Sequence, residues 1–360
     1  MQSSFRVLFS VVLAAFLVVL QTEASPTSSN STLEARQGAG GCSHIRVRKE
    51  WRTLSALQKL DYIRAVKCLQ TRRAKSRDHP SVVTLWDEFQ YSHVVSAHEA
   101  HIGQFLPWHR NYLRIYEQTL RESCLYFGPL PYWNQAIDAD NAAVPIINSP
   151  VFHPILGFGG DGAPGTYTLP TDPHPTDPVL SSRIIPELYK GCVVDGPFAN
   201  TVLHVGPGYL STNHCVARGI NEDLRPFVTT AAVNVVLAQP TFETFRNELD
   251  GTTVFPLPPN SKPHDAGHAL IGGHMTNFYT SPGEPLFYLH HGNVDRIWWL
   301  WQKADLANRL TDISGPVNVN DLTGPQVNLS TMLNYSSLTP SVPIGDMMNT
   351  EAAPLCYIYA

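Results

Sequence analysis

Eight of the fifteen histidines of this chain fall into two clusters that could bind metal ions. The first cluster contains His93, His98, His101 and His109, and the second contains His264, His268, His290 and His291. Burying several imidazoles beside aromatic and apolar segments is unfavourable unless each finds a partner. A shared metal ion supplies that partner, so the clusters predict metal sites. The other histidines have no neighbours at ligand spacing, and we interpret them as ordinary polar residues: His44, His79, His153, His174, His204, His214 and His274.

The second cluster shows the spacing of a single metal site. His264 and His268 lie four residues apart, which on a helix places both imidazoles on one face, about one turn apart. His291, at the start of a separate helical segment, can supply the third ligand, whereas His290 would point about 100° away around that helix. Asp295 lies one turn after His291 and can orient the ligands and hold the helix in place.

The ligand type narrows the choice of metal. Imidazole suits copper, zinc, iron or nickel, and the sequence offers no acidic cluster for calcium or magnesium. A zinc hydrolase normally carries a glutamate base within a His-Glu-x-x-His helix. Here the two histidines of the second cluster enclose Asp265–Gly267, and the string HEAH at 98–101 has the wrong spacing. Two three-histidine sites without a bridging carboxylate favour a redox pair of copper ions that hold dioxygen between them.

Apolar periodicity predicts the helices that carry these side chains. Ser55 followed by Gln58 forms a capping box, which starts a helix running to about Leu69. Further helices are predicted at Leu85–Ala97, Trp108–Ser123, His264–Ile271 and Val294–Ala304. Between Gly128 and Asn260, Pro, Gly, Asp and Thr dominate, so we expect loops. This region should hold only short helical or extended pieces, such as Leu180–Tyr189 and Pro240–Leu249.

Two long motifs around the histidines resemble the metal signatures of the tyrosinase and catechol oxidase family. The string FLPWHR at Phe105–Arg110, with Glu117 beyond it, resembles the copper A signature. The string PLFYLHHGNVDR at Pro285–Arg296 resembles the copper B signature, in which the second of the paired histidines is the ligand. Val47–Arg52 and Pro131–Trp133 also resemble the short secreted fungal members, so the similarity covers most of the chain.

This resemblance implies a mainly α-helical, tyrosinase-like domain whose central four-helix bundle holds a dicopper centre, with long irregular loops and few short strands. It assigns copper A to His93, His101 and His109, and copper B to His264, His268 and His291. Phe89 stands where the family places a phenylalanine before its first ligand. Ala100 occupies the expected place of the second copper A histidine, so His98 stays open as the alternative to His101.

Other positions depart from the family pattern. Glu99 stands where some fungal relatives carry a cysteine that forms a thioether link, so we expect no such link. Asn134 and Gln135 replace the family's Asp and Trp after Pro-Tyr-Trp, and Glu284 replaces the Asp that leads copper B. We expect these replacements to be tolerated.

The resemblance also implies a reaction, in which dioxygen at two copper ions oxidises o-diphenols to o-quinones and, in some members, hydroxylates monophenols. Asp265 follows the first copper B histidine, where hydroxylating members often carry asparagine. Asn260 stands where several relatives hold an activating water with a glutamate. Deprotonation of a phenol needs a base within hydrogen-bond reach, and Asp265 can serve as that base. We therefore predict oxidation of o-diphenols or o-aminophenols, to o-quinones or quinone imines, above hydroxylation of tyrosine.

The predicted substrate is a small phenol or aminophenol, or a tyrosine-containing peptide, in fungal pigment or secondary-metabolite biosynthesis. A non-catalytic dioxygen carrier like the haemocyanins is one alternative, although such carriers use large assemblies and a blocked pocket. A zinc hydrolase is the other, and it predicts no colour and no oxygen dependence. Tyr357–Tyr359 resembles the Tyr-x-Tyr motif that closes the catalytic domain of longer tyrosinases, so we expect no C-terminal lid domain.

The N-terminus and the cysteines predict secretion. Arg6 precedes an apolar run and the small residues of Thr22–Ala24, a pattern typical of a signal peptide over residues 1–24. The run is short for a membrane span. Residues 25–41 lack periodicity and indicate a disordered leader, with Arg36 as the expected place of trimming, before a single catalytic domain at 42–360.

Composition excludes some partners and leaves other details open. The six cysteines suit three disulfides in an oxidising compartment, but the sequence does not choose among the possible pairings. Glycosylation triplets begin at Asn30, Asn328 and Asn334. A net charge of -5 offers no attraction for phosphate backbones, so we expect no nucleic acid as a partner. No stretch after the N-terminal run is long and apolar enough to span a bilayer, so we expect no membrane partner either.

Overall fold

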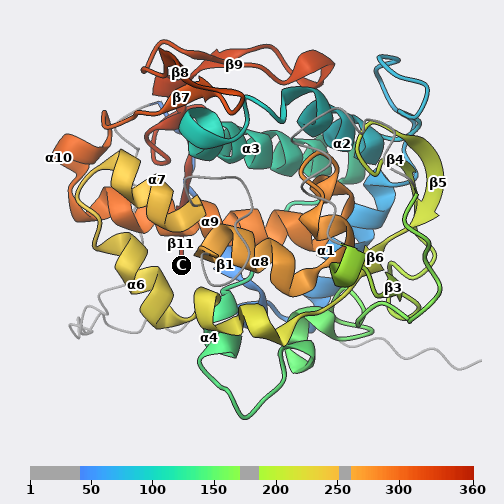
Figure 1. Cartoon of the computed structure of the whole chain (residues 1–360). Coiled ribbons are helices and arrows are strands. Elements are labelled where there is room, and N and C mark those ends of the chain that lie inside the picture. The colour runs from blue at the N-terminus through green and yellow to red at the C-terminus, as the bar shows by residue number, and fades with distance from the viewer. Residues whose placement is uncertain (1–40, 171–185, 251–260) are drawn as a thin grey trace, which may run out of the picture. The chain divides into compact units, whose positions relative to one another are not determined.

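The computed structural model describes residues 41–170, 186–250 and 261–360 (Figure 1). The predicted signal peptide at 1–24, the predicted leader up to residue 40 and Asn260 lie outside these residues. The described residues belong to one compact unit. Within the described ranges, no helix combines the length and the apolar character needed to cross a bilayer.

Helices form most of the regular structure and the strands are few and short, which confirms the predicted mainly α fold (Figure 1). The helices are α1 (Ala56–Leu69), α2 (Leu85–Ser96), α3 (Phe105–Cys124), α4 (Gln135–Ala139), α6 (Thr230–Leu237), α7 (Phe242–Asp250), α8 (Pro263–Ile271), α9 (Leu286–Ala304) and α10 (Leu306–Arg309). The strands are β1 (Arg46–Glu50), β2 (Pro131–Tyr132), β3 (Gly191–Cys192), β4 (Val202–Val205), β5 (Ser211–Cys215), β6 (Ala217–Arg218), β7 (Pro316–Asn318), β8 (Asp321–Gln326), β9 (Met332–Leu333), β10 (Val342–Pro343) and β11 (Tyr357–Tyr359). The candidate ligands come from the central helices α2, α3, α8 and α9 and the turn after α2.

Local sequence signals place several helix starts correctly. The side chain of Ser55 accepts the N–H of Gln58 while Gln58 accepts the N–H of Ser55, which is the predicted capping box of α1. Helix α2 begins at the predicted Leu85, and α7 and α8 lie within two residues of their predicted ranges. Helix α6 was not identified from the sequence. Of the predicted piece Leu180–Tyr189, only residues from 186 onward are described, and they contain a 3-10 turn at Pro186–Leu188.

Helix α3 starts three residues before its predicted start, at Phe105 rather than Trp108. Pro107 lies in its first turn, where the missing N–H of proline removes no intrahelical hydrogen bond. The earlier start places His109 inside the helix, at the beginning of its second turn. The helix ends at Cys124, and the C-cap residue Leu125 adopts a left-handed conformation with φ of 54°.

Helix α9 begins at Leu286, eight residues before the predicted start at Val294, so the prediction was wrong here. Every residue from Leu286 to Asp295 is buried, and a helix without an exposed face shows no alternation of polar and apolar residues. His291 therefore lies in the second turn of α9 and not at the start of a helical segment. The carboxylate of Glu284 caps this start by accepting the N–H of Leu286 at 3.1 Å.

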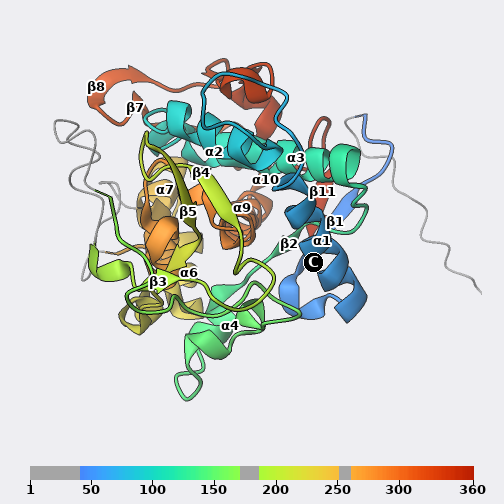
Figure 2. The same ribbon diagram turned by 90° about the vertical axis from the view of Figure 1, so that its right-hand side faces the viewer.

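A small parallel sheet joins the two ends of the described chain. Strand β1 pairs with β11, with Arg48 opposite Tyr359, and its other end pairs with β2. Figure 2 shows β1, β2 and β11 together beside α1. Parallel pairing between the first and last strands brings residues more than 300 positions apart into contact.

Three disulfide bonds use all six cysteines: Cys42–Cys356, Cys68–Cys124 and Cys192–Cys215. This confirms the predicted number of disulfides and supplies the pairing that the sequence left open. The first bond closes the contact between the chain ends, the second joins the ends of α1 and α3, and the third links β3 to β5. Such links stabilise a fold mainly by restricting the unfolded chain.

The carboxylate of Asp295 on α9 lies at the centre of a buried polar network. It accepts hydrogen bonds from Arg48 on β1 at 3.1 Å and from Arg110 on α3 at 2.6 Å. The hydroxyls of Tyr357 and Tyr359 on β11 also donate to it. Burial alone would raise the pKa of Asp295, but the two guanidinium groups hold it below its usual range. Asp295 thus holds α9 in place, as predicted, through partners that are not metal ligands.

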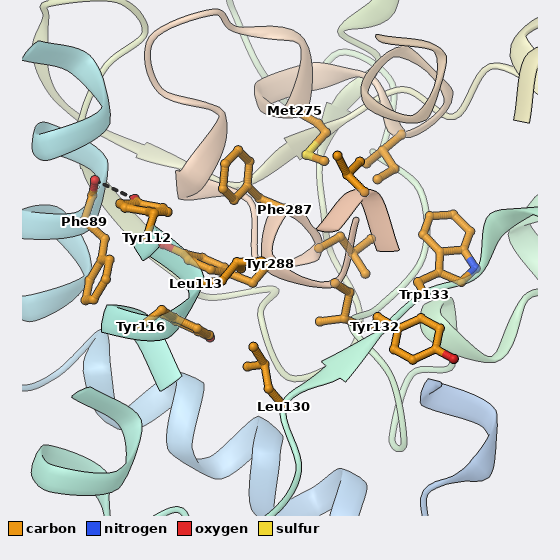
Figure 3. Close-up of a cluster of buried hydrophobic side chains, with 14 of the residues drawn as sticks. Phe89, Tyr112, Leu113, Tyr116, Leu130, Tyr132, Trp133, Met275, Phe287 and Tyr288 are labelled. Atoms are coloured by element: carbon orange, nitrogen blue, oxygen red, sulfur yellow. Dashed lines mark hydrogen bonds between the residues drawn. The ribbon is translucent and has the colours of Figure 1, made fainter. Parts of the chain in front are cut away.

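Aromatic side chains from α2, α3 and α9 form the apolar core beside this network (Figure 3). Tyr116 and Tyr288 stack with ring centroids 3.7 Å apart. The hydroxyl of Tyr112 donates to the carbonyl oxygen of Phe89 at 2.7 Å, the bond dashed in Figure 3. Close packing of these rings fixes the three helices relative to one another and thereby positions the histidines that they carry.

We predict that Asp295→Asn lowers the free energy of unfolding by about 3–5 kcal/mol, because Arg110 loses its counter-charge and Arg48 keeps only Glu117. Urea unfolding followed by circular dichroism measures the change. Glu351→Gln is the control, since the ion pair of Glu351 with Lys303 is nearly half exposed and its loss should cost less than about 1 kcal/mol. Equal stability of Asp295→Asn and the wild type would contradict the role given to this carboxylate.

Candidate metal centre

Helices α2 and α3 bring three histidines of the first cluster together. His93 lies on α2, His109 lies on α3, and His101 lies in the turn between them. Their ring centroids are 5.7 Å apart for His93 and His101, 5.5 Å for His93 and His109, and 6.0 Å for His101 and His109. All three side chains are buried.

Backbone carbonyl groups fix the protons of these three rings. Each Nδ1 lies near one carbonyl oxygen: His93 near Tyr279 at 2.8 Å, His101 near Ala97 at 2.6 Å, and His109 near Phe105 at 2.9 Å. A carbonyl oxygen only accepts, so each Nδ1 carries the proton and each Nε2 keeps a lone pair for a metal ion.

His98, the open alternative to His101, shares the contact with Phe278 but is hydrogen-bonded to a tyrosine. Its Nε2 lies 2.8 Å from the hydroxyl of Tyr279, and its ring packs against Phe278 and Tyr279. His101 also packs on Phe278, with ring centroids 4.3 Å apart, and it contacts the rings of His93 and His109 as well. The geometry therefore favours His101 as the member of the three-histidine group.

Helices α8 and α9 bring the second cluster together. The Nε2 atom of His268 lies 3.0 Å from Nε2 of His264 and 3.1 Å from Nε2 of His291. The two groups meet where the rings of His109 and His291 stack, with centroids 4.3 Å apart and planes inclined by 15°. Six buried imidazoles thus form two adjacent groups of three.

The outer nitrogens of the second group have unlike partners. Nδ1 of His268 lies 2.6 Å from the carbonyl oxygen of Met275. Nδ1 of His264 lies 2.6 Å from the carboxylate of Asp250, the last residue of α7, and 3.2 Å from that of Asp265. Burial alone would lower the pKa of His264, but the charge of Asp250 raises it to about 9. A carboxylate on the outer nitrogen fixes the ring and strengthens Nε2 as a ligand.

Burial keeps the other candidate ligands neutral. It lowers the pKa of His93 to about 4 and that of His101 to about 3. It also holds the pKa values of His109, His268 and His291 well below their usual value. Neutral imidazole is the form that ligates a metal ion, so these rings need not lose a proton first.

The donor set fits a transition-metal cation. The Nε2 atom of His268 lies only 3.0 and 3.1 Å from the Nε2 atoms of His264 and His291. At such distances the nitrogen lone pairs would repel one another unless a cation or a proton lies between them. Nε2 of His109 is buried and has no hydrogen-bond partner in the part of the chain that the structure describes. Ligation by nitrogen alone suits copper, zinc, iron or nickel. The residues that would hold two such ions are His93, His101, His109, His264, His268 and His291.

His290 lies beside the second group but is held by Gln135. Nε2 of Gln135 donates to Nδ1 of His290 at 2.6 Å, and its Oε1 accepts from Asn293 at 3.2 Å, which fixes the amide. Nε2 of His290 therefore carries the proton and cannot ligate, although it lies near the group. Gly267 leaves room for this ring, since a Cβ there would lie 2.2 Å from Cε1 of His290.

Asp250 is the site residue that the sequence analysis missed. It lies 14 positions before His264, and no local pattern marks a carboxylate at a helix end as the partner of a distant imidazole. The predicted base Asp265 is buried, and its carboxylate approaches Nδ1 of His264, across the ring from Nε2. Asn260, the other predicted catalytic residue, lies outside the described residues.

Comparisons with known proteins all find tyrosinases or polyphenol oxidases. The family model for the common central domain of tyrosinase matches residues 77–304. The chain is 34% identical to the tyrosinase-like protein phomQ1 of Diaporthe leptostromiformis over 346 residues, which cover 88% of this chain and 78% of the relative. It is 32% identical to tyrosinase P of Aspergillus terreus over 339 residues, covering 88% and 93%. A solved variant of polyphenol oxidase from Thermothelomyces thermophila has a TM-score of 0.76 at 28% identity, covering 88% of this chain and 89% of that chain.

We predict that Asp250→Asn weakens metal binding by about 10- to 100-fold, the usual effect of removing the outer partner of a ligating histidine. Competition with a chromophoric chelator measures the affinity. Glu248→Gln on the same helix is the control, because Glu248 pairs with the partly exposed Lys262. If Asp250→Asn binds metal as tightly as the wild type, the carboxylate does not support the site.

Proposed function

The chain belongs to the tyrosinase family, and from this premise we propose that it is a secreted oxidase that uses two copper ions and dioxygen to oxidise o-diphenols or o-aminophenols. His93, His101 and His109 would hold copper A, and His264, His268 and His291 would hold copper B. The stacking of His109 on His291 carries this proposal. Because the stack makes the two groups neighbours, the six rings would hold both copper ions within one site.

Bound copper would supply the redox chemistry, since it binds dioxygen and accepts the electrons of the substrate. The residues of the chain prepare the site for it. Carbonyl groups and Asp250 orient the imidazoles, so that Nε2 is free to ligate. Burial excludes water from the ligands and keeps five of the six rings neutral.

We place oxidation of o-diphenols and o-aminophenols above hydroxylation because oxidation requires no new carbon–oxygen bond. Hydroxylation first requires a deprotonated monophenol. Asp265 stays the proposed base for that step, and Asn260 stays the proposed neighbour of an activating water. Because Asp265 approaches the Nδ1 side of His264, it would reach a phenol at the metal ions through a water molecule. This longer path is a reason to rank hydroxylation below oxidation.

We further propose that the protein is exported and acts in fungal pigment or secondary-metabolite biosynthesis, on a small phenol, an aminophenol or a tyrosine-containing peptide. The fungal origin of its relatives supports this setting. Three disulfides suit an oxidising compartment. The acceptor residues Asn328 and Asn334 are exposed, as glycosylation requires. A signal peptide at 1–24 remains part of this proposal.

We predict that His109→Ala and His291→Ala each lose about one of the two copper ions and all oxygen uptake, because each removes one of three ligands. Elemental analysis and an oxygen electrode measure both effects on protein that is still folded. The exposed His44→Ala is the control. His101→Ala should lose copper and His98→Ala should keep it. Full activity of His109→Ala or His291→Ala, or a wild type that takes up zinc and consumes no oxygen, would refute the proposal.

We predict faster oxygen uptake on catechol and o-aminophenol than on tyrosine. Asp265→Ala should slow uptake on tyrosine more than uptake on catechol, because only hydroxylation needs the base. Glu243→Gln, at an exposed position of α7, is the control. Equal losses on both substrates argue against Asp265 as the base, and tyrosine as the faster substrate reverses the proposed order.

A further inference from the structure

His98, which the proposed copper centre leaves unused, is hydrogen-bonded to a tyrosine next to that centre. The hydroxyl of Tyr279 lies 2.8 Å from Nε2 of His98, and Tyr279 is fully buried. The carbonyl oxygen of Tyr279 accepts the Nδ1–H of His93 at 2.8 Å. One hydrogen bond therefore joins the backbone of Tyr279 to a proposed copper A ligand, and another joins its phenol to an imidazole.

Several other buried tyrosines in the described part of the chain donate to groups that are weaker bases than an imidazole. Their acceptors are carbonyl oxygens or one carboxylate: Tyr112 donates to Phe89, Tyr126 to Pro129, Tyr335 to Trp108, and Tyr357 and Tyr359 to Asp295. A carbonyl oxygen is a very weak base. Asp295 is kept ionised by two guanidinium groups, which lowers its affinity for a proton. An imidazole nitrogen, in contrast, is a good acceptor for a phenol proton.

A second tyrosine–histidine contact, between Tyr167 and His274, lacks this capacity. Nδ1 of His274 accepts the N–H of Ala217 at 2.8 Å, so the proton of the neutral ring lies on Nε2. Nε2 faces the hydroxyl of Tyr167 at 3.4 Å. This imidazole can donate to the phenol but cannot receive its proton, which makes Tyr167 a matched control for Tyr279.

Tyr209 connects Tyr279 to the surface. The two ring centroids are 4.8 Å apart, and 37% of Tyr209 is exposed. The aromatic core of Figure 3 also reaches the site, but its Tyr112, Tyr116 and Tyr288 are all fully buried. The path through Tyr279 therefore ends at a partly exposed tyrosine, Tyr209, whereas the tyrosines of the aromatic core are all buried.

We propose that Nε2 of His98 is unprotonated and accepts the phenol proton of Tyr279, and that Tyr279 is a redox-active residue that reduces the oxidised centre when no substrate is bound. This inference rests on the proposed copper-oxidase function. One electron leaves the phenol of Tyr279 for the oxidised metal centre, the O–H bond breaks, and the proton moves to Nε2 of His98. Oxidising equivalents then leave the site before they can attack the imidazole ligands.

Tyr209 then reduces the Tyr279 radical back to the neutral phenol. One electron passes from Tyr209 to the Tyr279 radical while His98 returns its proton, so that Tyr279 regains its hydroxyl. Tyr209 releases its own proton to water and becomes a radical at the surface. A phenol in solution then gives one hydrogen atom to Tyr209 and completes the cycle.

The test treats the copper-loaded full chain with hydrogen peroxide in the absence of phenols and freezes samples for electron paramagnetic resonance. We expect a tyrosyl radical in the wild type and in Tyr167→Phe, and its loss in Tyr279→Phe and His98→Gln. Mass spectrometry of the histidine-bearing peptides gives a second readout. Ligand oxidation should be several-fold faster in Tyr279→Phe than in Tyr167→Phe.

An unchanged radical in Tyr279→Phe or His98→Gln, or equal ligand oxidation in Tyr279→Phe and Tyr167→Phe, overturns the proposal. Tyr279→Phe removes only a hydroxyl and keeps the carbonyl bond to His93, and copper content checks this. Tyr209→Phe is an independent variant that should prolong the Tyr279 radical, and an unchanged decay contradicts the path. A wild type without bound copper refutes the oxidase proposal, whereas copper and oxygen uptake without a radical refute only this inference.

Discussion

The position of α9 depends on one buried carboxylate, Asp295, and on the cations that neutralise it. A carboxylate in an apolar interior is stable only when it is paired and hydrogen-bonded. Arg48 reaches it from β1 and Arg110 reaches it from α3. Because β1 pairs with β11, this requirement gathers both ends of the described chain beside α9. It also sets α9 against α3, so that His291, one turn from Asp295, stacks on His109.

The surroundings of the two histidine groups differ in charge. The first group donates its outer protons to neutral carbonyl oxygens, whereas His264 in the second group lies between the carboxylates of Asp250 and Asp265. Negative charge behind one ligand should favour a higher positive charge on the ion that this ligand holds. The first group in turn borders Tyr279, whose phenol is bonded to His98. The two ions would therefore sit in unlike environments although both have three imidazole ligands.

Local sequence signals predicted helices that have one exposed face and a clear cap. Helix α1 shows both, since Ser55 forms the capping box that the sequence suggested. Helix α9 shows neither, because its first half is buried on all sides and its cap is the side chain of Glu284, which lies before the helix. The sequence pattern therefore did not reveal that α9 begins at Leu286, nor that His291 lies inside the helix. Periodicity reports a boundary between core and solvent, and a helix without that boundary carries no such signal.

By itself, the sequence determined the two histidine clusters, the two signature motifs and the supply of cysteines, because these depend on residue types and on spacing within one helix or motif. Tertiary structure alone decided which distant residues meet. It paired Cys42 with Cys356, placed Asp250 on His264, and separated His98 from the group that contains His101. The physical reason is that spacing along a helix follows from its 3.6 residues per turn. Contacts between remote segments follow from the packing and charge pairing of the whole chain.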